Sequence, residues 1–242
     1  KVFSYTKIPE EILNYKNVVY GGTGFFPDGG RDLPKEIEHH MPDYNLYNEY
    51  ISKELTLGAK RSNYSDYLDY SIGFTTRGCF RKCSFCVNKK YDRVLTHSPV
   101  EEFLDKDRPK IYLCDDNFMA YPKWNKVLDD LEATKKPFQF RQGLDIRLIT
   151  DEKAYRLSHV KYHGDYIFAF DSIQDRTLIE KKLMLWRQYC KKSTKLYVLV
   201  AYDSQDVLDI VNTFERIRIL MKYGCLPYIM RYEKYKSCDL RS

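Results

Sequence analysis

Six short runs of apolar and β-branched residues recur along the chain from residue 70 onward, each of a length typical of a buried strand. They are residues 70–76, 110–114, 137–141, 166–170, 196–201 and 226–231. The intervening stretches carry apolar residues at helical spacing and predict helices at residues 98–105, 122–133, 151–158, 175–189 and 205–223. Strand and helix therefore alternate about every 30 residues, which indicates successive βαβ units on a parallel sheet.

Six such units occupy about 170 residues, too few for a closed eight-unit barrel of about 250 residues. We therefore expect an α/β fold in which residues 70–242 form an open, partial (β/α)6 barrel. Residues 1–69 lack this regular alternation of predicted strands and helices. Apolar residues 18–20 run into the glycine-rich residues 21–24, and this pattern predicts a short Rossmann-like remnant. Residues 25–70, rich in Pro, Gly, Tyr and Asn, predict a long linker that wraps the surface.

Three of the seven cysteines lie close together, with the spacing Cys-x3-Cys-x2-Cys: Cys79, Cys83 and Cys86. An odd number of cysteines, most of them scattered singly, favours a reducing, cytoplasmic compartment over a disulfide framework. A structural zinc site would need a fourth ligand nearby, and the next candidate, His97, lies eleven residues after Cys86. Three thiolates instead suit a [4Fe–4S] cluster with one iron open to a small molecule.

Polar residues follow the predicted strands. Asp115, Asp116 and Asn117 come after the second strand, Gln142 after the third and Asp171 after the fourth. Because the carboxyl ends of parallel strands meet at one edge, where α/β proteins build their sites, we expect these side chains to face the cysteines. Some polar residues after strands also cap helices. Two aromatic residues near these ends, Phe118 and Tyr202, either line a pocket or pack in the core.

The chain resembles the radical SAM superfamily in three features. They are the spacing of the cysteines, the presence of Phe85 just before the third cysteine, and the position of the motif after the first predicted strand. The resemblance implies that Cys79, Cys83 and Cys86 hold three irons of a [4Fe–4S] cluster. The fourth iron would chelate S-adenosylmethionine (SAM), and an electron would split SAM into methionine and a 5′-deoxyadenosyl radical. The substrate of that radical is left open by the resemblance.

The same resemblance suggests which residues contact SAM. Asp115, Asp116 and Asn117 stand where many members carry Gly-Gly-Glu, facing the SAM ammonium group. Gln142 and Asp171 stand where the family places groups that reach the SAM carboxylate or ribose. Phe85 completes the expected SAM-binding set.

Residues 141–148 and 227–232 are similar to uncharacterised bacterial and phage radical SAM proteins of the branch associated with cobalamin-binding domains. The Asp-x-His-x-x-Gly motif that supplies an axial histidine to cobalamin is absent from the sequence. Residues 1–24 are also too few for a sheet that could hold a corrin. We therefore expect this chain to act without cobalamin.

The net charge of +6 is concentrated, because residues 77–93 carry six basic side chains and one acid. Such a window would face an anionic cluster, or dock an electron donor of the flavodoxin or ferredoxin type. The alternative is an iron–sulfur or zinc-stapled module that binds nucleic acid through this window and the 22 tyrosines, without SAM turnover. No run of about 18 apolar residues and no secretory signal are visible, so no membrane role is expected.

Overall fold

The computed structural model describes residues 14–18, 31–86, 88, 90–202 and 204–232. All six strands predicted from residue 70 onward are present within these residues. They are β1 (Tyr70–Gly73), β4 (Lys110–Leu113), β5 (Phe138–Phe140), β6 (Tyr166–Ala169), β7 (Thr194–Val200) and β8 (Leu226–Arg231). The predicted Rossmann-like remnant lies almost entirely outside the described residues.

The strands form two three-stranded sheets with the orders β1-β4-β5 and β6-β7-β8, and every neighbouring pair in them is parallel. A parallel bridge between Phe138 and Tyr162 connects the sheets, and the Leu144 N–H donates to the Ile167 carbonyl at 2.8 Å. The prediction of a parallel α/β fold is therefore confirmed.

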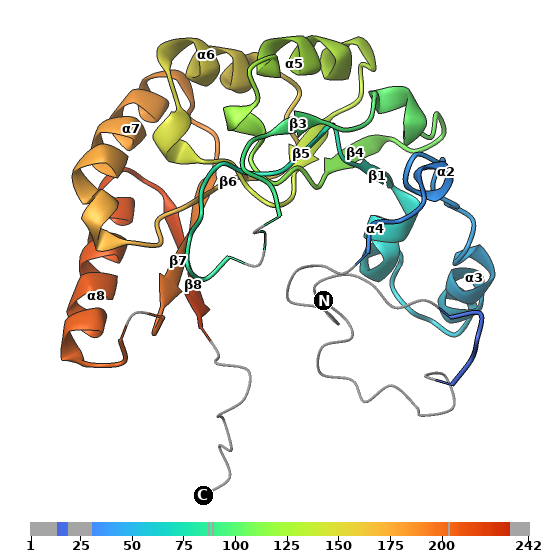
Figure 1. The fold of residues 1–242 in the computed structure, drawn as a ribbon, viewed down its shortest axis with the longest axis horizontal. Coiled ribbons are helices and arrows are strands. Elements are labelled where there is room, and N and C mark those ends of the chain that lie inside the picture. The colour runs from blue at the N-terminus through green and yellow to red at the C-terminus, as the bar shows by residue number, and fades with distance from the viewer. Residues whose placement is uncertain (1–13, 19–30, 87, 89, 203, 233–242) are drawn as a thin grey trace, which may run out of the picture.

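Four helices cover the outer side of the arc of strands, as Figure 1 shows. They are α5 (Trp124–Ala133), α6 (Asp151–His159), α7 (Arg176–Tyr189) and α8 (Val207–Lys222), and all four were predicted. Short 3₁₀ turns connect strands to helices at η3 (Phe118–Ala120), η4 (Ile146–Leu148) and η5 (Ile173–Asp175). None of the described helices is both long and apolar enough to cross a membrane.

Two predictions near the first strand were wrong in detail. The helix expected at residues 98–105 is only the 3₁₀ turn η2 (Val100–Glu102), after which Phe103 turns into the core. The first strand ends at Gly73, where a Cβ would collide with the Phe103 ring. The chain then resumes as β2 (Thr76–Arg77), which pairs antiparallel with β3 (Leu95–Thr96).

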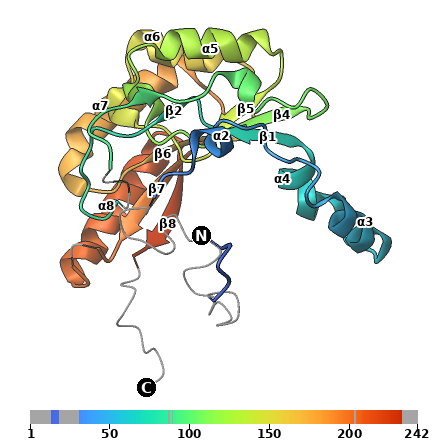
Figure 2. The same ribbon diagram turned by 45° about the vertical axis from the view of Figure 1, so that its right-hand side comes forward.

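The linker expected at residues 25–70 contains four short helical segments that its sequence did not indicate. They are α2 (Lys35–Glu38), α3 (Asn48–Thr56), η1 (Arg61–Tyr64) and α4 (Ser65–Leu68). Helix α3 extends away from the sheets in Figure 2 and buries only Ile51. With nine residues and one buried side chain, this helix is shorter than the stretch of 11–18 residues over which helical periodicity is read.

Tyr44 and Arg108 attach the linker to β1, the edge strand of its sheet. The Tyr44 hydroxyl accepts from the Ile72 N–H at 2.8 Å and donates to the Phe103 carbonyl at 2.7 Å. Arg108, only 7% exposed, donates to the Tyr44 carbonyl at 2.8 Å and the Tyr70 carbonyl at 3.2 Å. The linker thereby covers backbone groups that an open edge would expose.

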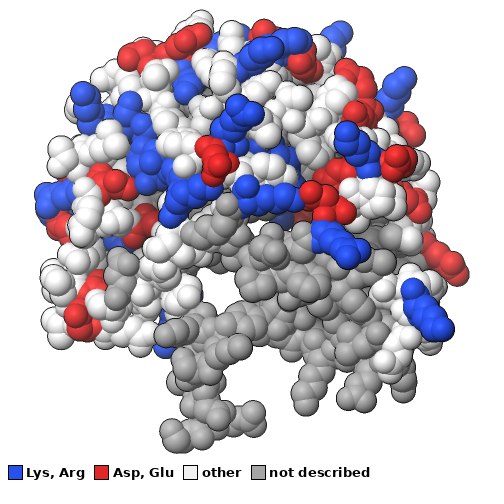
Figure 3. Space-filling model, viewed as in Figure 1, with Lys and Arg blue, Asp and Glu red and all other residues white. Residues whose placement is uncertain are grey.

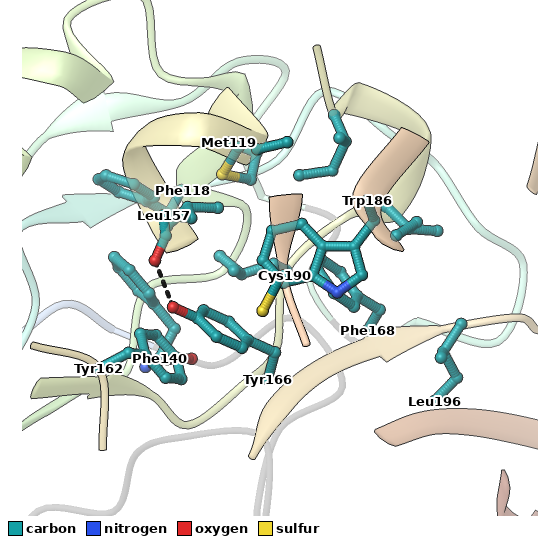
Figure 4. Packing of buried hydrophobic residues seen from close by; sticks show 14 of the residues in the cluster. Phe118, Met119, Phe140, Leu157, Tyr162, Tyr166, Phe168, Trp186, Cys190 and Leu196 are labelled. Carbon is teal, nitrogen blue, oxygen red and sulfur yellow. Dashed lines mark hydrogen bonds between the residues drawn. The ribbon is translucent and has the colours of Figure 1, made fainter. Parts of the chain in front are cut away.

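The main core lies between the strands and the outer helices, and about a third of its buried residues are aromatic (Figure 4). The rings of Phe118 and Phe140 stack at 4.3 Å, so Phe118 is a core residue and not part of a pocket. The Trp186 ring packs edge-on against Tyr166 at 4.8 Å, and its N–H donates to the Thr194 hydroxyl at 3.0 Å. The buried indole therefore keeps a hydrogen-bond partner.

Two neighbouring residues of α7 test this packing. Leu183 is fully buried, whereas Met184 is 54% exposed. Leu183→Ala should lower the free energy of unfolding by about 2–5 kcal/mol, because it removes buried methyl groups and leaves a cavity. Met184→Ala should change it by less than about 0.5 kcal/mol. Urea denaturation measures the free energy of unfolding of both variants. Equal losses would contradict the finding that α7 faces the core with Leu183 and solvent with Met184.

Candidate active site

The three predicted cysteines lie on the loop between β2 and β3, which the β2–β3 ladder closes at its base. Gly78, at the start of the loop, has a φ of 101°, and a Cβ there would collide with the Arg93 carbonyl oxygen. The loop can therefore leave β2 in this direction only with glycine at this position. All three cysteines are partly exposed and free of disulfides.

N–H groups donate to the sulfur atoms of Cys79 and Cys86. The Asn117 side-chain amide donates to Cys79 Sγ at 3.2 Å, and the Asn88 N–H donates to Cys86 Sγ at 3.4 Å. Burial raises the pKa of the Cys83 thiol, and nearby Arg147 opposes that rise. Hydrogen bonds to sulfur and a nearby cation are two means by which proteins tune thiolate ligands.

Within the described part of the chain, no group of three or more His, Cys, Asp or Glu side chains is placed so that it could hold a metal ion. The structure therefore brings the cysteines onto one loop without arranging them around a single ion. A closed zinc site needs four ligands about one ion, and the described residues contain no such set. Three thiols on one loop are the kind of donor set that a [4Fe–4S] cluster needs, because such a cluster binds each sulfur at a different iron.

Asp115 is fully buried beneath the loop and holds the turn that leads into β2. Its carboxylate accepts from the Thr75 N–H at 3.1 Å, the Thr76 N–H at 2.6 Å and both threonine hydroxyls at 2.6 Å. Burial raises the pKa of Asp115, although these hydrogen bonds act in the opposite direction. Its carboxylate thus points into the protein and is occupied by four donors.

The next two residues approach the cysteine loop directly. The Asp116 carboxylate accepts from the Gly78 N–H at 2.7 Å and remains partly exposed. Asn117 is 4% exposed, and while its amide nitrogen contacts Cys79, its Oδ1 is buried without a hydrogen-bond partner. An unsatisfied buried acceptor next to a sulfur is a polar group that a ligand could satisfy.

A cavity of about 350 Å³ lies beside the loop and brings Cys83, Phe85 and Asp171 together. The Phe85 ring packs edge-on against Tyr202 at 5.5 Å, so this tyrosine does belong to a pocket. Gln142 is exposed at the end of β5 and is not among the described residues that line the cavity. The structure thus brings two of the six predicted SAM contacts to the cavity and places Asp116 and Asn117 at the base of the loop.

Arg216 is a lining residue that sequence analysis missed. It is 2% exposed on α8, and its guanidinium donates to the carbonyls of Asp171 at 2.7 Å and Leu199 at 2.8 Å. It therefore joins the carboxyl ends of β6 and β7 at the cavity floor. The available signal was a charged residue on the same helix face as the buried Ile219 and Leu220.

Burial raises the pKa of Asp171 to about 6, although Arg147 and a backbone hydrogen bond from Leu199 act to lower it. This carboxyl therefore titrates close to neutral pH, which is common at functional sites.

Carboxylates neutralise several cations of the basic window. Arg81 pairs with Asp145, Lys82 with Asp92 and Lys90 with Asp32. Figure 3 shows Lys and Arg side chains across the middle of this face, with Asp and Glu side chains among them. The window is therefore a mixed surface, and it does not favour the nucleic-acid-binding alternative.

No protein-family model matches the chain. A curated relative, the 2-(S-pantetheinyl)-carbapenam-3-carboxylate methyltransferase of Streptantibioticus cattleyicolor, is 24% identical over 213 residues, which cover 84% of this chain and 27% of the relative. The chain thus spans about a quarter of the length of this relative.

Among solved structures, Streptococcus suis SuiB bound to S-adenosylmethionine has a TM-score of 0.50 at 14% identity, over 80% of this chain and 53% of SuiB. A second crystal structure of SuiB has a TM-score of 0.49 at 13% identity, over 80% and 52% of the two chains. The first similarity shows a shared α/β fold.

The buried carboxylate of Asp115 can be tested against its exposed neighbour. Asp115→Ala leaves the N–H groups of Thr75 and Thr76 without an acceptor, and should lower the free energy of unfolding by about 2–5 kcal/mol. Asp116→Ala removes one hydrogen bond at a wetter site and should cost about 1 kcal/mol. Urea denaturation of the two variants measures these changes. Equal losses in the free energy of unfolding would contradict the anchoring role of Asp115.

Asp171 gives the metal-free protein a defined pH dependence. Because its folded pKa is raised, the carboxyl favours the folded state below about pH 4, and this contribution is lost as the pH rises through 6. Asp171→Asn cannot ionise, so at pH 8 it should be more stable than the parent by at most about 3 kcal/mol, with the gain vanishing near pH 4. Urea denaturation at pH 4, 6 and 8 measures this. The exposed Asp107→Asn is the control, and a pH-independent gain would contradict the assignment.

Proposed function

We propose that the chain is a radical SAM enzyme that binds a [4Fe–4S] cluster and SAM, and cleaves SAM reductively to act on a substrate through a 5′-deoxyadenosyl radical. The observation that carries the proposal is the position of the Cys-x3-Cys-x2-Cys loop, at the carboxyl ends of parallel strands and beside a cavity lined by Phe85 and Asp171. The fold shared with a SAM-bound SuiB and the similarity to a methyltransferase support a SAM-using enzyme.

Six parallel strands in chain order, with α5 to α8 on their outer side, support a partial (β/α)6 barrel as the architecture of this enzyme. In barrels of parallel strands, active sites lie at the carboxyl ends, where the cysteine loop is found here. The loop would hold the cluster over this end through Cys79, Cys83 and Cys86.

Such a cluster, when bound, supplies the electron that splits SAM. The protein's own residues would do the positioning: the Asn117 amide orients the Cys79 sulfur, and the Asn88 N–H orients that of Cys86. Phe85 offers an aromatic face to adenine, and Asp171 can accept hydrogen bonds from the ribose hydroxyls.

The roles of the other predicted SAM contacts are inferred from their positions after the strands. Asp116, Asn117 and Gln142 follow β4 and β5 at the edge that carries the loop, and we retain them as groups for the ammonium and carboxylate of SAM. Asp115 would act indirectly, because its carboxylate is already bonded to Thr75 and Thr76. Cobalamin has no part in the proposal, since the sequence lacks its axial histidine motif.

A one-electron donor of the flavodoxin or ferredoxin type would reduce the cluster from the face that carries the basic window. Residues 77–93 carry six basic side chains and one acidic side chain, and this excess of positive charge would attract an acidic donor. The free state of the six described cysteines supports a reducing compartment such as the cytoplasm.

Replacement of single cysteines tests the proposal. After anaerobic reconstitution with iron, sulfide, SAM and dithionite, the parent protein should show a visible charge-transfer band and release 5′-deoxyadenosine. Cys83→Ala should lose both, because one iron loses its ligand. Cys114→Ala, at the end of β4 and away from the loop, should retain both. Full iron content in Cys83→Ala, or a parent protein that forms no 5′-deoxyadenosine, would refute the function.

A further inference from the structure

Four charged side chains form a continuous chain of ion pairs from the cysteine loop to the start of α7. Arg81, in the loop, pairs with Asp145, which follows β5. Asp145 also accepts from Arg147 Nε at 2.8 Å, and Arg147 donates through Nη1 to Asp175 at 2.8 Å. The order Arg81, Asp145, Arg147, Asp175 alternates in charge, so each inner member is held from both sides.

The centre of this chain is buried. The Asp145 side chain is 8% exposed, and the side chains of Arg81 and Arg147 are 26% and 22% exposed. Low exposure weakens screening by water and makes the loss of one partner costly for the others. Asp145 also accepts from the Arg147 backbone N–H at 3.2 Å, so its position is fixed by η4 itself.

The cysteine loop needs an anchor of this kind. Nearly twenty residues separate β2 from β3, and those that the structure describes form no helix or strand. Asp115 and Asp116 hold only the beginning of the loop, at Thr75, Thr76 and Gly78. Ordering the remainder costs conformational entropy that local contacts must offset.

We infer that Asp145 is a positioning residue that holds the cysteine loop over the end of β5 through Arg81, with Arg147 and Asp175 fixing its carboxylate from the other side. The importance of this contact for catalysis rests on the proposed function, whereas its effect on the loop does not. The same arrangement holds the Arg147 cation against Asp145, the direct partner of Arg81 in the cysteine loop, where Arg147 would stabilise added negative charge.

Hydrogen exchange of the metal-free protein tests the anchor directly. Asp145→Asn and Arg81→Gln should each speed amide exchange at residues 79–86 by about tenfold or more, since each breaks the same buried pair. The double variant should exchange no faster than Asp145→Asn alone, because that change already removes the partner of Arg81. Arg156→Gln, which removes two ion pairs between α6 and α5, is the control and should leave this loop unchanged.

Unchanged exchange at residues 79–86 in folded Asp145→Asn would overturn the inference. So would faster exchange in the double variant than in both single variants. If the parent protein assembles no cluster, the proposed function fails, yet the exchange experiment still decides whether Asp145 anchors the loop.

A second measurement distinguishes the electrostatic effect of the Arg147 cation on the cluster from its effect on the stability of the fold. In reconstituted protein, Arg147→Gln should shift the midpoint potential of the cluster to a more negative value, because a nearby cation favours the reduced state. Arg147→Lys keeps the charge and should remain close to the parent. A midpoint potential that does not move in Arg147→Gln would overturn the electrostatic part of the inference.

Discussion

Four hydrogen bonds converge on the buried carboxylate of Asp115, and the geometry of the site depends on them. They join the end of β4 to the turn between β1 and β2, and so decide where the cysteine loop begins. A buried carboxylate without donors would be costly, while one with four donors is a rigid junction. Gly78 then directs the chain into the loop with a backbone conformation that other residues rarely adopt.

The acidic side chains around the cysteine loop mainly hold it in place through hydrogen bonds and ion pairs. Asp116 binds the Gly78 N–H, and Asp145 binds Arg81. The basic residues between positions 77 and 93 suggest an anion-binding surface, but several of them form ion pairs within the protein. Asp171, whose pKa burial raises to about 6, instead lines the cavity together with Cys83. Carboxylates that anchor the loop and a carboxylate that faces the cavity thus lie at the same end of the sheet.

The large elements of the fold were predictable because their local pattern and their tertiary environment agree. Strands β4 and β5 are short apolar runs, and helices α5 and α7 bury one regular stripe of side chains. The helices between residues 31 and 69 escaped prediction because they bury almost nothing and, at four to nine residues, are too short to establish a helical period. The β2–β3 ladder, of two residue pairs, is too short to leave a sequence signal.

For the site, the sequence by itself determined that three cysteines share one loop after the first strand, because spacing along the chain limits how far apart they can lie. Only the tertiary structure decided the roles of the polar residues. Asp115 and Asp116 are adjacent and chemically identical, yet one is sealed beneath the loop and the other remains partly exposed. That difference comes from Thr75 and Thr76, about 40 positions away, which donate hydrogen bonds to Asp115. The ion pair of Arg81 and Asp145 likewise joins residues 64 positions apart. Hydrogen bonds and ion pairs over such separations exist only after the chain has folded, so no local pattern encodes them.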